Sequence, residues 1–436
     1  MRAQERFNAW QCTLGEAAYG AGMGLTAVTT VLPLLFHSLG AAEFEIGAIF
    51  GIATAGWLLG QPFGLFMLGR RRRGKQFLLG WCVVFWVPTY IAMGAAVHLL
   101  GTGDPPLCRA LLLVVLSVWV LGDGMIGPLW IDWLSRLFGP EARGQAMGMM
   151  AWATANTAAA LVAGQFVSAA AFPHGYVALF WAAAALFVLG LVAYMRVADP
   201  PMAGEAPALY RGRDLLLRFG WSIRERNFRN YLVGRVLLTL GGGTAGFLAV
   251  FFGRPEGGSV PAATVIRLGA FLALAQGMAS YALGWLGDRI GHTGGVLTGA
   301  LAQAAAIVIA YLGRGELACG ACFVILGVAF SAGWVSHLNM LFETCPHENR
   351  AAHITLGSLL LSPFVMVVPV ATGALVAKLG WRTGIGLALV PTLMGVAWLA
   401  LAVREPRAIE LRGRTEQVSE WINGPSERLE RHQDTG

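Results

Sequence analysis

The stretch GYVALFWAAAALFVLGLVAYM fills residues 175–195 and contains no charged side chain. A helix rises about 1.5 Å per residue, so an apolar run of this length covers the ~30 Å hydrocarbon core of a bilayer. Inside that core, only a helix or a closed barrel satisfies the hydrogen bonds of the backbone. Residues 175–195 therefore predict a transmembrane helix.

The composition of the whole 436-residue chain agrees with this interpretation. Hydrophobic residues make up 56% of the chain and charged residues only 13%, with a mean hydropathy of +0.62, whereas soluble proteins carry roughly 25% charged residues. We therefore expect an all-α membrane protein. A globular enzyme and a nucleic-acid binder are both excluded, in spite of the net charge of +7.

Similar apolar runs, each bounded by charged residues or by Gly and Pro turns, recur along the chain. Each run is long enough to cross a bilayer as a helix. The sequence thus predicts twelve spans, and an even number places both termini on the same side of the membrane. The spans are expected at residues 12–38, 44–69, 77–100, 108–134, 145–171, 175–195, 230–253, 262–287, 293–313, 317–342, 353–378 and 383–403.

The basic residues between these spans predict the orientation. Arginine and lysine accumulate in cytoplasmic loops of membrane proteins. A cytoplasmic N-terminus places the run Arg70–Arg73 and the arginine-rich segment 196–229 on the cytoplasmic side. The Ala- and Gly-rich, lysine-poor composition indicates a bacterial source, so we expect a multi-pass protein of the inner membrane with both termini in the cytoplasm. The loops on the other side keep only Arg109, Arg254, Arg314, Lys378 and Arg382.

The chain also divides into two similar halves. Phe7 and Trp10 are echoed at a constant offset by Phe228 and Tyr231. Two pseudo-equivalent halves predict a site at the midplane between them and alternating access by rocking of one half against the other. The expected divisions are an N-terminal six-helix half (1–195), a cytoplasmic central loop (196–229), a C-terminal six-helix half (230–403) and a cytoplasmic tail (404–436).

A loop in the second half carries a family signature. The segment Gly284-Trp-Leu-Gly-Asp-Arg-Ile-Gly-His292 resembles the loop motif Gly-x-Leu-x-Asp-Arg-x-Gly-basic of the major facilitator superfamily. This resemblance implies the twelve-helix fold of that superfamily, and it assigns Asp288 and Arg289 to an ion-pair lock on the cytoplasmic side. The corresponding first-half segment, residues 64–75, has no aspartate, so the lock is expected to depend mainly on the second half.

Asp123 is the sharpest candidate for chemistry. It lies near the middle of the predicted span 108–134, where a charged side chain costs about 2.5 to 3.5 kcal/mol on insertion scales and usually has a function. At about 3.6 residues per turn, Trp119 and Trp130 share its helix face. A carboxylate flanked by indoles suits a proton site or a cation pocket. The alternative is a structural aspartate that bonds to a neighbouring helix.

Three other charged residues are candidates for gating. Glu16 and Arg235 lie two positions apart in the alignment of the two halves. The first and seventh spans face each other in the resembled fold, so an ion pair between them could close the cytoplasmic side, although each could instead extend to the membrane interface. Asp132 is one helical turn before Arg136, so it is a gating candidate or a helix-end ion pair.

Uncharged polar residues inside the spans are candidates for lining a central cavity. Each of them could equally hydrogen-bond one helix to another. These residues are Asn156, Gln165, Gln276, Gln303, His337 and Asn339.

These observations predict a monomeric secondary transporter that moves a small solute by alternating access, in symport with protons. We expect the lipid bilayer, the solute and protons as its partners, and no cofactor, nucleic acid or metal. One alternative is an escort or assembly factor of the same fold that does not transport. A second is a soft-metal transporter, because Cys319 and Cys322 share one helix face and other soft ligands occur in the spans. These are Met147, Met149, Met150, His337 and Met340. The two thiols alone are too few ligands for a site.

Overall fold

The computed structural model describes residues 3–68, 75–137, 149–198, 220, 222–344 and 350–406, and these residues are helical with no β-strand among them. The predicted all-α fold is therefore confirmed for this part of the chain. The helices before residue 199, here called the first bundle, are α1 (Ala3–Leu25), α2 (Val31–Ser38), α3 (Glu43–Leu68), α4 (Lys75–Leu100), α5 (Pro105–Leu137), α7 (Met149–Ala169) and α8 (His174–Met195).

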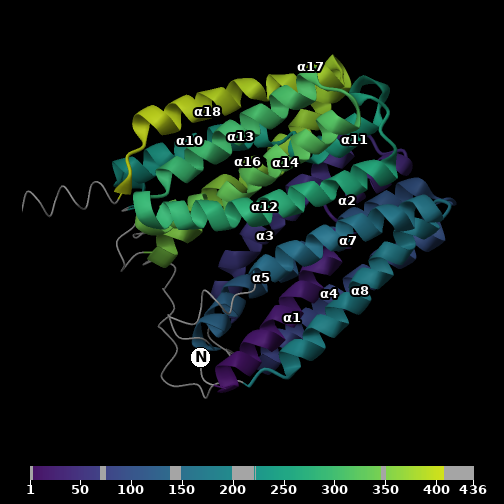
Figure 1. The fold of residues 1–436 in the computed structure, drawn as a ribbon, viewed down its shortest axis with the longest axis horizontal. Coiled ribbons are helices and arrows are strands. Elements are labelled where there is room, and N and C mark those ends of the chain that lie inside the picture. Colours follow the sequence, from purple (N-terminus) through teal and green to yellow (C-terminus); the bar gives the residue numbers. More distant parts are fainter. Residues whose placement is uncertain are drawn as a thin grey trace, which may run out of the picture.

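The helices after residue 219 form the second bundle (Figure 1). A side-chain cap begins this bundle, because the Glu225 carboxylate accepts hydrogen bonds from the backbone N–H groups of Asn227 and Phe228. The elements are α10 (Arg226–Gly242), η1 (Ala245–Phe247), α11 (Leu248–Gly253), η2 (Pro255–Gly257), α12 (Ala262–Ile290), α13 (Thr293–Leu312), α14 (Gly315–Trp334), α15 (Ser336–Glu343), α16 (Arg350–Leu379), α17 (Trp381–Leu387) and α18 (Leu389–Ala402).

Both bundles run lengthwise between two ends of the molecule (Figure 1). We call the end at which α1 begins and α18 finishes the terminal end, and the other the opposite end. In the described residues, ten stretches are long and apolar enough to cross a bilayer. The pair α1 and α2, and α7, fall outside these ten, so the count of twelve spans stays a prediction.

Several predicted spans are interrupted, which the sequence analysis did not foresee. The span expected at 12–38 is broken between α1 and α2, where residues 26–30 leave the helix. The span expected at 230–253 changes to a 3-10 turn at Ala245–Phe247, and the span at 317–342 breaks at Val335. Hydropathy reports only how apolar a stretch is, so it does not register such breaks.

Glycines bring α3 and α5 into close contact. Gly56, Gly60 and Gly64 recur every fourth residue along α3 and so share one face. A Cβ on Gly60 would lie 2.7 Å from the backbone oxygen of Leu121, and one on Gly64 would lie 1.9 Å from that of Met125. Such stripes of small residues let membrane helices approach backbone to backbone.

The two bundles meet through α3 with α16 and through α7 with α12. Here too glycines allow the approach, because a Cβ on Gly47 would lie 2.2 Å from the backbone oxygen of Pro369, and one on Gly51 would lie 2.7 Å from that of Met366. These contacts lie in the part of α3 nearest the opposite end. Toward the terminal end the ribbons of the two bundles spread apart (Figure 1).

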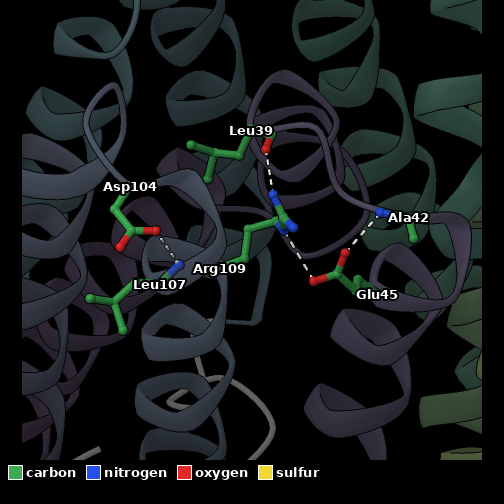
Figure 2. Close-up of polar contacts among 6 residues, drawn as sticks. All are labelled: Leu39, Ala42, Glu45, Asp104, Leu107 and Arg109. Atoms are coloured by element: carbon green, nitrogen blue, oxygen red, sulfur yellow. Dashed lines mark hydrogen bonds and ion pairs between the residues drawn. The ribbon is translucent and has the colours of Figure 1, made fainter.

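An arginine closes the first bundle at the opposite end (Figure 2). The Nε of Arg109 lies 3.1 Å from Oε1 of Glu45, and its Nη1 donates to the carbonyl oxygen of Leu39 at 2.6 Å. Glu45 in turn accepts from the backbone N–H of Ala42 at 2.8 Å. Arg109 therefore joins α5 to the turn between α2 and α3.

Each bundle is also closed at the terminal end by an asparagine. The Asn8 amide donates to the carbonyl oxygen of Ala198 at 3.0 Å and accepts from its N–H at 2.9 Å. Asn227 makes the same two bonds with Arg404, both at 2.9 Å. We call each pair of bonds an asparagine clasp. The clasps join the first helix of each bundle to a residue two or three positions after the end of its last helix, which supports the internal repeat.

The clasps should contribute measurably to stability, and unequally. Asn8 is 4% exposed whereas Asn227 is half-buried, so Asn8→Ala leaves the Ala198 backbone groups without partners in a drier setting. We expect Asn8→Ala to lower the free energy of unfolding by about 1–3 kcal/mol, and Asn227→Ala by less. Thermal unfolding of the purified protein in detergent measures both. An Asn8→Asp control keeps the acceptor and should fall between wild type and Asn8→Ala, and equal midpoints for all variants would contradict the assignment.

Candidate functional site

Asp123 lies on α5 with its carboxylate held by two aromatic donors. The indole N–H of Trp86 on α4 donates to Oδ1 at 3.0 Å, and the Tyr19 hydroxyl on α1 approaches Oδ2 at 3.5 Å. The side chains of Asp123 and Tyr19 are half-buried, whereas Trp86 is 6% exposed. Asp123 therefore joins three helices and remains partly accessible.

Glu16 is a second carboxylate in the same region. The Tyr194 hydroxyl on α8 donates to its Oε1 at 2.8 Å, and the Trp130 side chain is a further hydrogen-bond partner. Glu16 is three residues before Tyr19 on α1, so the two side chains share a helix face. The charge of Glu16 acts on Asp123 as well.

Aromatic rings enclose both carboxylates, and we call this group the aromatic cage. Tyr19 lies 4.8 Å from Trp86 between ring centroids, and Trp130 meets Tyr194 edge to face at 4.5 Å. The residues of the cage come from α1, α4, α5 and α8. They are Tyr19, Trp86, Tyr90, Trp119, Trp130, Trp133, Phe187 and Tyr194.

Two glycines on α1 make room for the cage. A Cβ on Gly15 would lie 2.4 Å from the Tyr194 ring, and one on Gly22 would lie 2.5 Å from the Phe187 ring. The rings of α8 thus press directly on the backbone of α1. This packing fixes the α1 face that carries Glu16 and Tyr19.

Trp119 and Trp130 both belong to the cage, although neither hydrogen-bonds to Asp123. Trp119 is 4% exposed and meets Tyr90 edge to face at 5.4 Å, and its indole N–H has no partner among the described residues. The Trp130 side chain is instead a hydrogen-bond partner of Glu16. Tyr19, Trp86 and Tyr194 were not predicted as site residues, because donors on other helices cannot be found from the periodicity of α5 alone.

Neither carboxylate has a cationic partner in the described part of the chain. The ion pairs there are Arg109–Glu45, Arg254–Glu256 and His292–Glu343. The predicted bridge between Glu16 and Arg235 is therefore not formed in this conformation. Whether that bridge forms when the terminal end closes stays a prediction.

Arg235 lies on α10 of the second bundle, near a buried tyrosine and histidine. Its charge acts on Tyr231 and His337. The Tyr231 hydroxyl lies 2.9 Å from Nδ1 of His337 and donates to the His337 carbonyl oxygen, also at 2.9 Å. His337 is 5% exposed, so it fastens α15 to α10 and does not present a free imidazole here.

Gln303 holds three helices together and also lines a small cavity. Its amide N–H₂ donates to the carbonyl oxygen of Leu238 at 2.9 Å and to the Thr392 hydroxyl at 3.1 Å. The cavity measures about 20 Å³, enough for one water molecule. Its walls include Gly242 and Thr244, at the break between α10 and η1.

The remaining cavity candidates lie on α7, α12 and α15. Gln165 is exposed, while Asn156, Gln276 and Asn339 are half-buried. A Cβ on Gly24 would lie 2.6 Å from the backbone oxygen of Asn156, so this part of α7 packs tightly on α1. The roles of these residues in lining a cavity stay predictions.

The predicted gate residues are only partly visible. The side chains of Asp288 and Asp132 lie outside the described residues, although both positions are helical. The Arg289 guanidinium lies over the Trp285 ring, 3.9 Å from its centroid, and Arg289 is exposed. This cation–π contact occupies Arg289 on its own helix.

The described residues contain no group of three or more His, Cys, Asp or Glu side chains that could hold a metal. Cys319 and Cys322 are both fully buried in α14, and the Cys322 thiol approaches the carbonyl oxygen of Ala306 at 3.4 Å. Within these ranges the two thiols therefore have no cluster of His, Asp or Glu side chains around them.

Part of the sequence matches the model of a known protein family. Residues 232–431 match the family model described as Major Facilitator Superfamily, and this range contains the Gly284–His292 motif. A comparison of the chain with individual curated proteins finds no match. By sequence, residues 232–431 thus resemble the Major Facilitator Superfamily.

Solved structures extend this result to the whole chain. A bacterial homolog of the human lysosomal transporter Spinster, inward-facing and unoccupied, matches with TM-score 0.66 and 16% identity over 92% of this chain and 97% of that one. A mutant of the nucleoside transporter NupG matches with TM-score 0.73 and 12% identity over 90% and 99%. A POT family transporter with a thioalcohol-conjugated peptide matches with TM-score 0.65 and 13% identity over 91% and 96%.

The chain therefore has the major facilitator fold throughout, and the resemblance seen in its sequence is confirmed. The family model and the fold together indicate a multi-pass membrane transporter and not an enzyme.

Proposed function

We propose that this protein is a secondary active transporter that moves a small solute by alternating access in symport with protons. The observation that carries the proposal is the pair Glu16 and Asp123, two carboxylates inside the first bundle with no cationic partner in the described residues. Charged side chains within membrane spans are costly and typically mark solute or proton pathways.

The chemistry of this pair fits proton exchange. Each carboxylate accepts hydrogen bonds from Trp or Tyr donors, which stabilise the ionised form without cancelling its charge. Asp123 and Glu16 are half-buried, so each side chain keeps some exposed surface. A carboxylate of this kind can take up a proton or a cation on one side of the membrane and release it on the other.

The arrangement of the bundles supports alternating access. Gly47 and Gly51 hold α3 against α16 near the opposite end, while the ribbons spread at the terminal end (Figure 1). With the termini in the cytoplasm, as the basic residues predict, this is an inward-facing conformation. Gating by Glu16 with Arg235, and by Asp132, Asp288 and Arg289, belongs to the same proposal.

The proposal also includes four further expectations from the sequence. These are an inner-membrane location, a monomer, the boundaries 1–195, 196–229, 230–403 and 404–436, and a cavity lined by the polar residues of α7, α12, α13 and α15. The solved neighbours are a Spinster homolog, a nucleoside transporter and a POT family transporter bound to a thioalcohol-conjugated peptide. They support a small solute without choosing among solutes.

Transport by the purified protein in liposomes tests this proposal. A panel of radiolabelled solutes is offered with an imposed pH gradient, acidic on the outside, and internal pH is followed with a trapped dye. We expect at least one solute to accumulate together with protons and to be released when a protonophore collapses the gradient. If a solute enters without protons, only the proton coupling is rejected. If no solute enters at all, the transport proposal is rejected and the escort or assembly factor becomes the better interpretation.

A further inference from the structure

The break between α10 and η1 borders the small cavity beside Gln303. α10 ends at Gly242, and the 3-10 turn begins at Ala245. Gly242, Thr244 and Ala245 all line the cavity, together with Gln303 of α13. At membrane depth, backbone outside a regular helix is tolerated where it is buried in protein or lines a cavity. The interrupted backbone of this span therefore meets a space of about one water molecule.

The contacts of Gln303 determine which of its amide atoms is left for the cavity. Its Nε2 donates to the carbonyl oxygen of Leu238 at 2.9 Å and to the Thr392 hydroxyl at 3.1 Å. The Thr392 hydroxyl donates its own hydrogen to the carbonyl oxygen of Ala388 at 2.8 Å, so it accepts from Gln303. Both N–H groups of the amide are thus used. The remaining amide atom is Oε1, and a Cβ on Gly242 would lie 3.6 Å from it.

The other polar side chain of the cavity also presents an oxygen acceptor. The Thr244 hydroxyl donates to the carbonyl oxygen of Gly241 at 3.3 Å, so the lone pairs of its Oγ1 can accept. The last carbonyl groups of a helix lack partners within the helix and carry its partial negative charge, and α10 ends at this point. The other side chains that line the cavity are apolar. The polar side chains here therefore offer acceptors and no unused donor.

Oxygen acceptors around a space of this size suit a small, hard cation. Carbonyl, amide and hydroxyl oxygens are typical ligands of such ions. In other membrane transporters, sodium is coordinated by unwound backbone carbonyls and by the C-terminal ends of broken helices. A lining of acceptors disfavours an anion. A water molecule also fits the cavity by size, so water is the competing occupant.

We propose that this cavity is a sodium site in which the ion is held by Oε1 of Gln303, Oγ1 of Thr244 and carbonyl oxygens at the end of α10. None of these ligands is a carboxylate, a thiol or an imidazole. The site lies in the second bundle, whereas Asp123 and Glu16 lie in the first. The ion therefore does not compete with a proton for either carboxylate, and the inference goes beyond the proposed proton coupling.

The cavity also borders the contact between the two bundles. Its wall includes Phe330 of α14, whose ring stacks on that of Phe50 of α3 at 6.2 Å. A Cβ on Gly246 of η1 would lie 3.0 Å from the Phe50 side chain. A second ring contact joins Trp57 of α3 to Trp334 of α14 at 5.1 Å. The proposed rocking would change these contacts and with them the walls of the site. Sodium would then bind the two conformations unequally, which is the condition for a ligand to shift their populations.

Equilibrium dialysis of radioactive sodium against the purified protein in detergent tests the inference. Choline chloride keeps the ionic strength constant, and the wild-type protein should bind sodium saturably. Thr244→Val removes the hydroxyl with little change of shape, and Gly242→Ala sets a methyl group against Oε1 of Gln303 at an ordinary contact distance. Each should weaken the affinity by about 10-fold or more. Thr244→Ser keeps the hydroxyl and should bind sodium more tightly than Thr244→Val.

Thr239→Val is the matched control on the same helix. The Thr239 hydroxyl donates to the carbonyl oxygen of Arg235 at 2.8 Å, and Thr239 does not line the cavity. This variant should bind sodium as the wild type does. Thermal unfolding in sodium chloride and in choline chloride reports whether each variant is folded, and sodium should raise the midpoint only of variants that bind it.

Two results would overturn the inference. The first is the absence of saturable sodium binding by the wild-type protein, which would leave water as the occupant of the cavity. The second is an unchanged affinity in both Thr244→Val and Gly242→Ala, which would place the bound sodium elsewhere.

The outcome is separable from that of the proposed function. If a solute enters liposomes together with protons and the purified protein does not bind sodium, only the sodium site is wrong. If sodium binds at this cavity and no solute enters, the site is correct and the transport proposal is rejected.

Discussion

Asp123→Asn should abolish accumulation of solute driven by a pH gradient while leaving folding intact. The substitution keeps an acceptor for the Trp86 indole, and its amide N–H₂ can donate to the Tyr19 hydroxyl, but it removes the group that changes protonation. We expect uptake under a gradient to fall at least about 10-fold, to the level without a gradient, the size expected when a positioned proton acceptor is lost. Solute exchange at equal pH on both sides should remain. Liposome uptake measures both.

Two variants frame this experiment. Asp104→Asn makes the same charge change directly before α5, at the opposite end of the molecule. This variant should accumulate solute normally. Glu16→Gln should reduce accumulation as well, because Glu16 acts on Asp123 electrostatically. Full gradient-driven uptake by Asp123→Asn would show that coupling does not pass through this residue.

Gly47→Val should shift the protein away from the conformation described here. A Cβ at position 47 would lie 2.2 Å from the Pro369 backbone oxygen and 3.0 Å from the Phe247 ring, so α3 cannot stay against α16. Overpacking of this kind costs about 1–3 kcal/mol, which changes the populations of two conformations roughly 5- to 150-fold. Transport should fail because the opposite end can no longer close.

Accessibility at position 30 reports this shift. Thr30 is 2% exposed, and its side chain would lie 2.8 Å from a Cβ on Gly269 of the second bundle. Thr30→Cys should therefore react slowly with a membrane-impermeant thiol reagent added from the opposite side, and quickly in the Gly47→Val background. Gly80→Val is the control, since a Cβ there meets nothing within 4 Å. Equal labelling in both backgrounds would contradict the assignment of this contact.

The long helices were predictable from sequence because membrane burial leaves a strong hydropathy signal. The spans expected at 77–100 and 293–313 agree with α4 and α13 to within two residues at each end. The breaks at residues 26–30 and at Val335 were not predictable. Both segments remain apolar, and the surrounding bundle, not composition, decides where the helix is interrupted.

The candidate site divides in the same way. A mid-span aspartate is visible in sequence because its cost has to be offset by a partner or a function. Its partners were not visible, since Trp86 and Tyr19 lie on α4 and α1 and reach Asp123 only after packing. The contact between Trp57 and Trp334 is even harder to predict from sequence, because it depends on how the two bundles meet.

The asparagine clasps bear on how the molecule deforms. Because Asn8 ties the start of α1 to Ala198, and Asn227 ties the start of α10 to Arg404, each bundle is a closed ring of helices at the end that spreads. The proposed rocking would therefore change the glycine contacts between the bundles. The hydrogen bonds of the two asparagine clasps would stay intact. In the proposed rocking motion, each bundle would therefore move as one rigid body about the α3–α16 contact at Gly47.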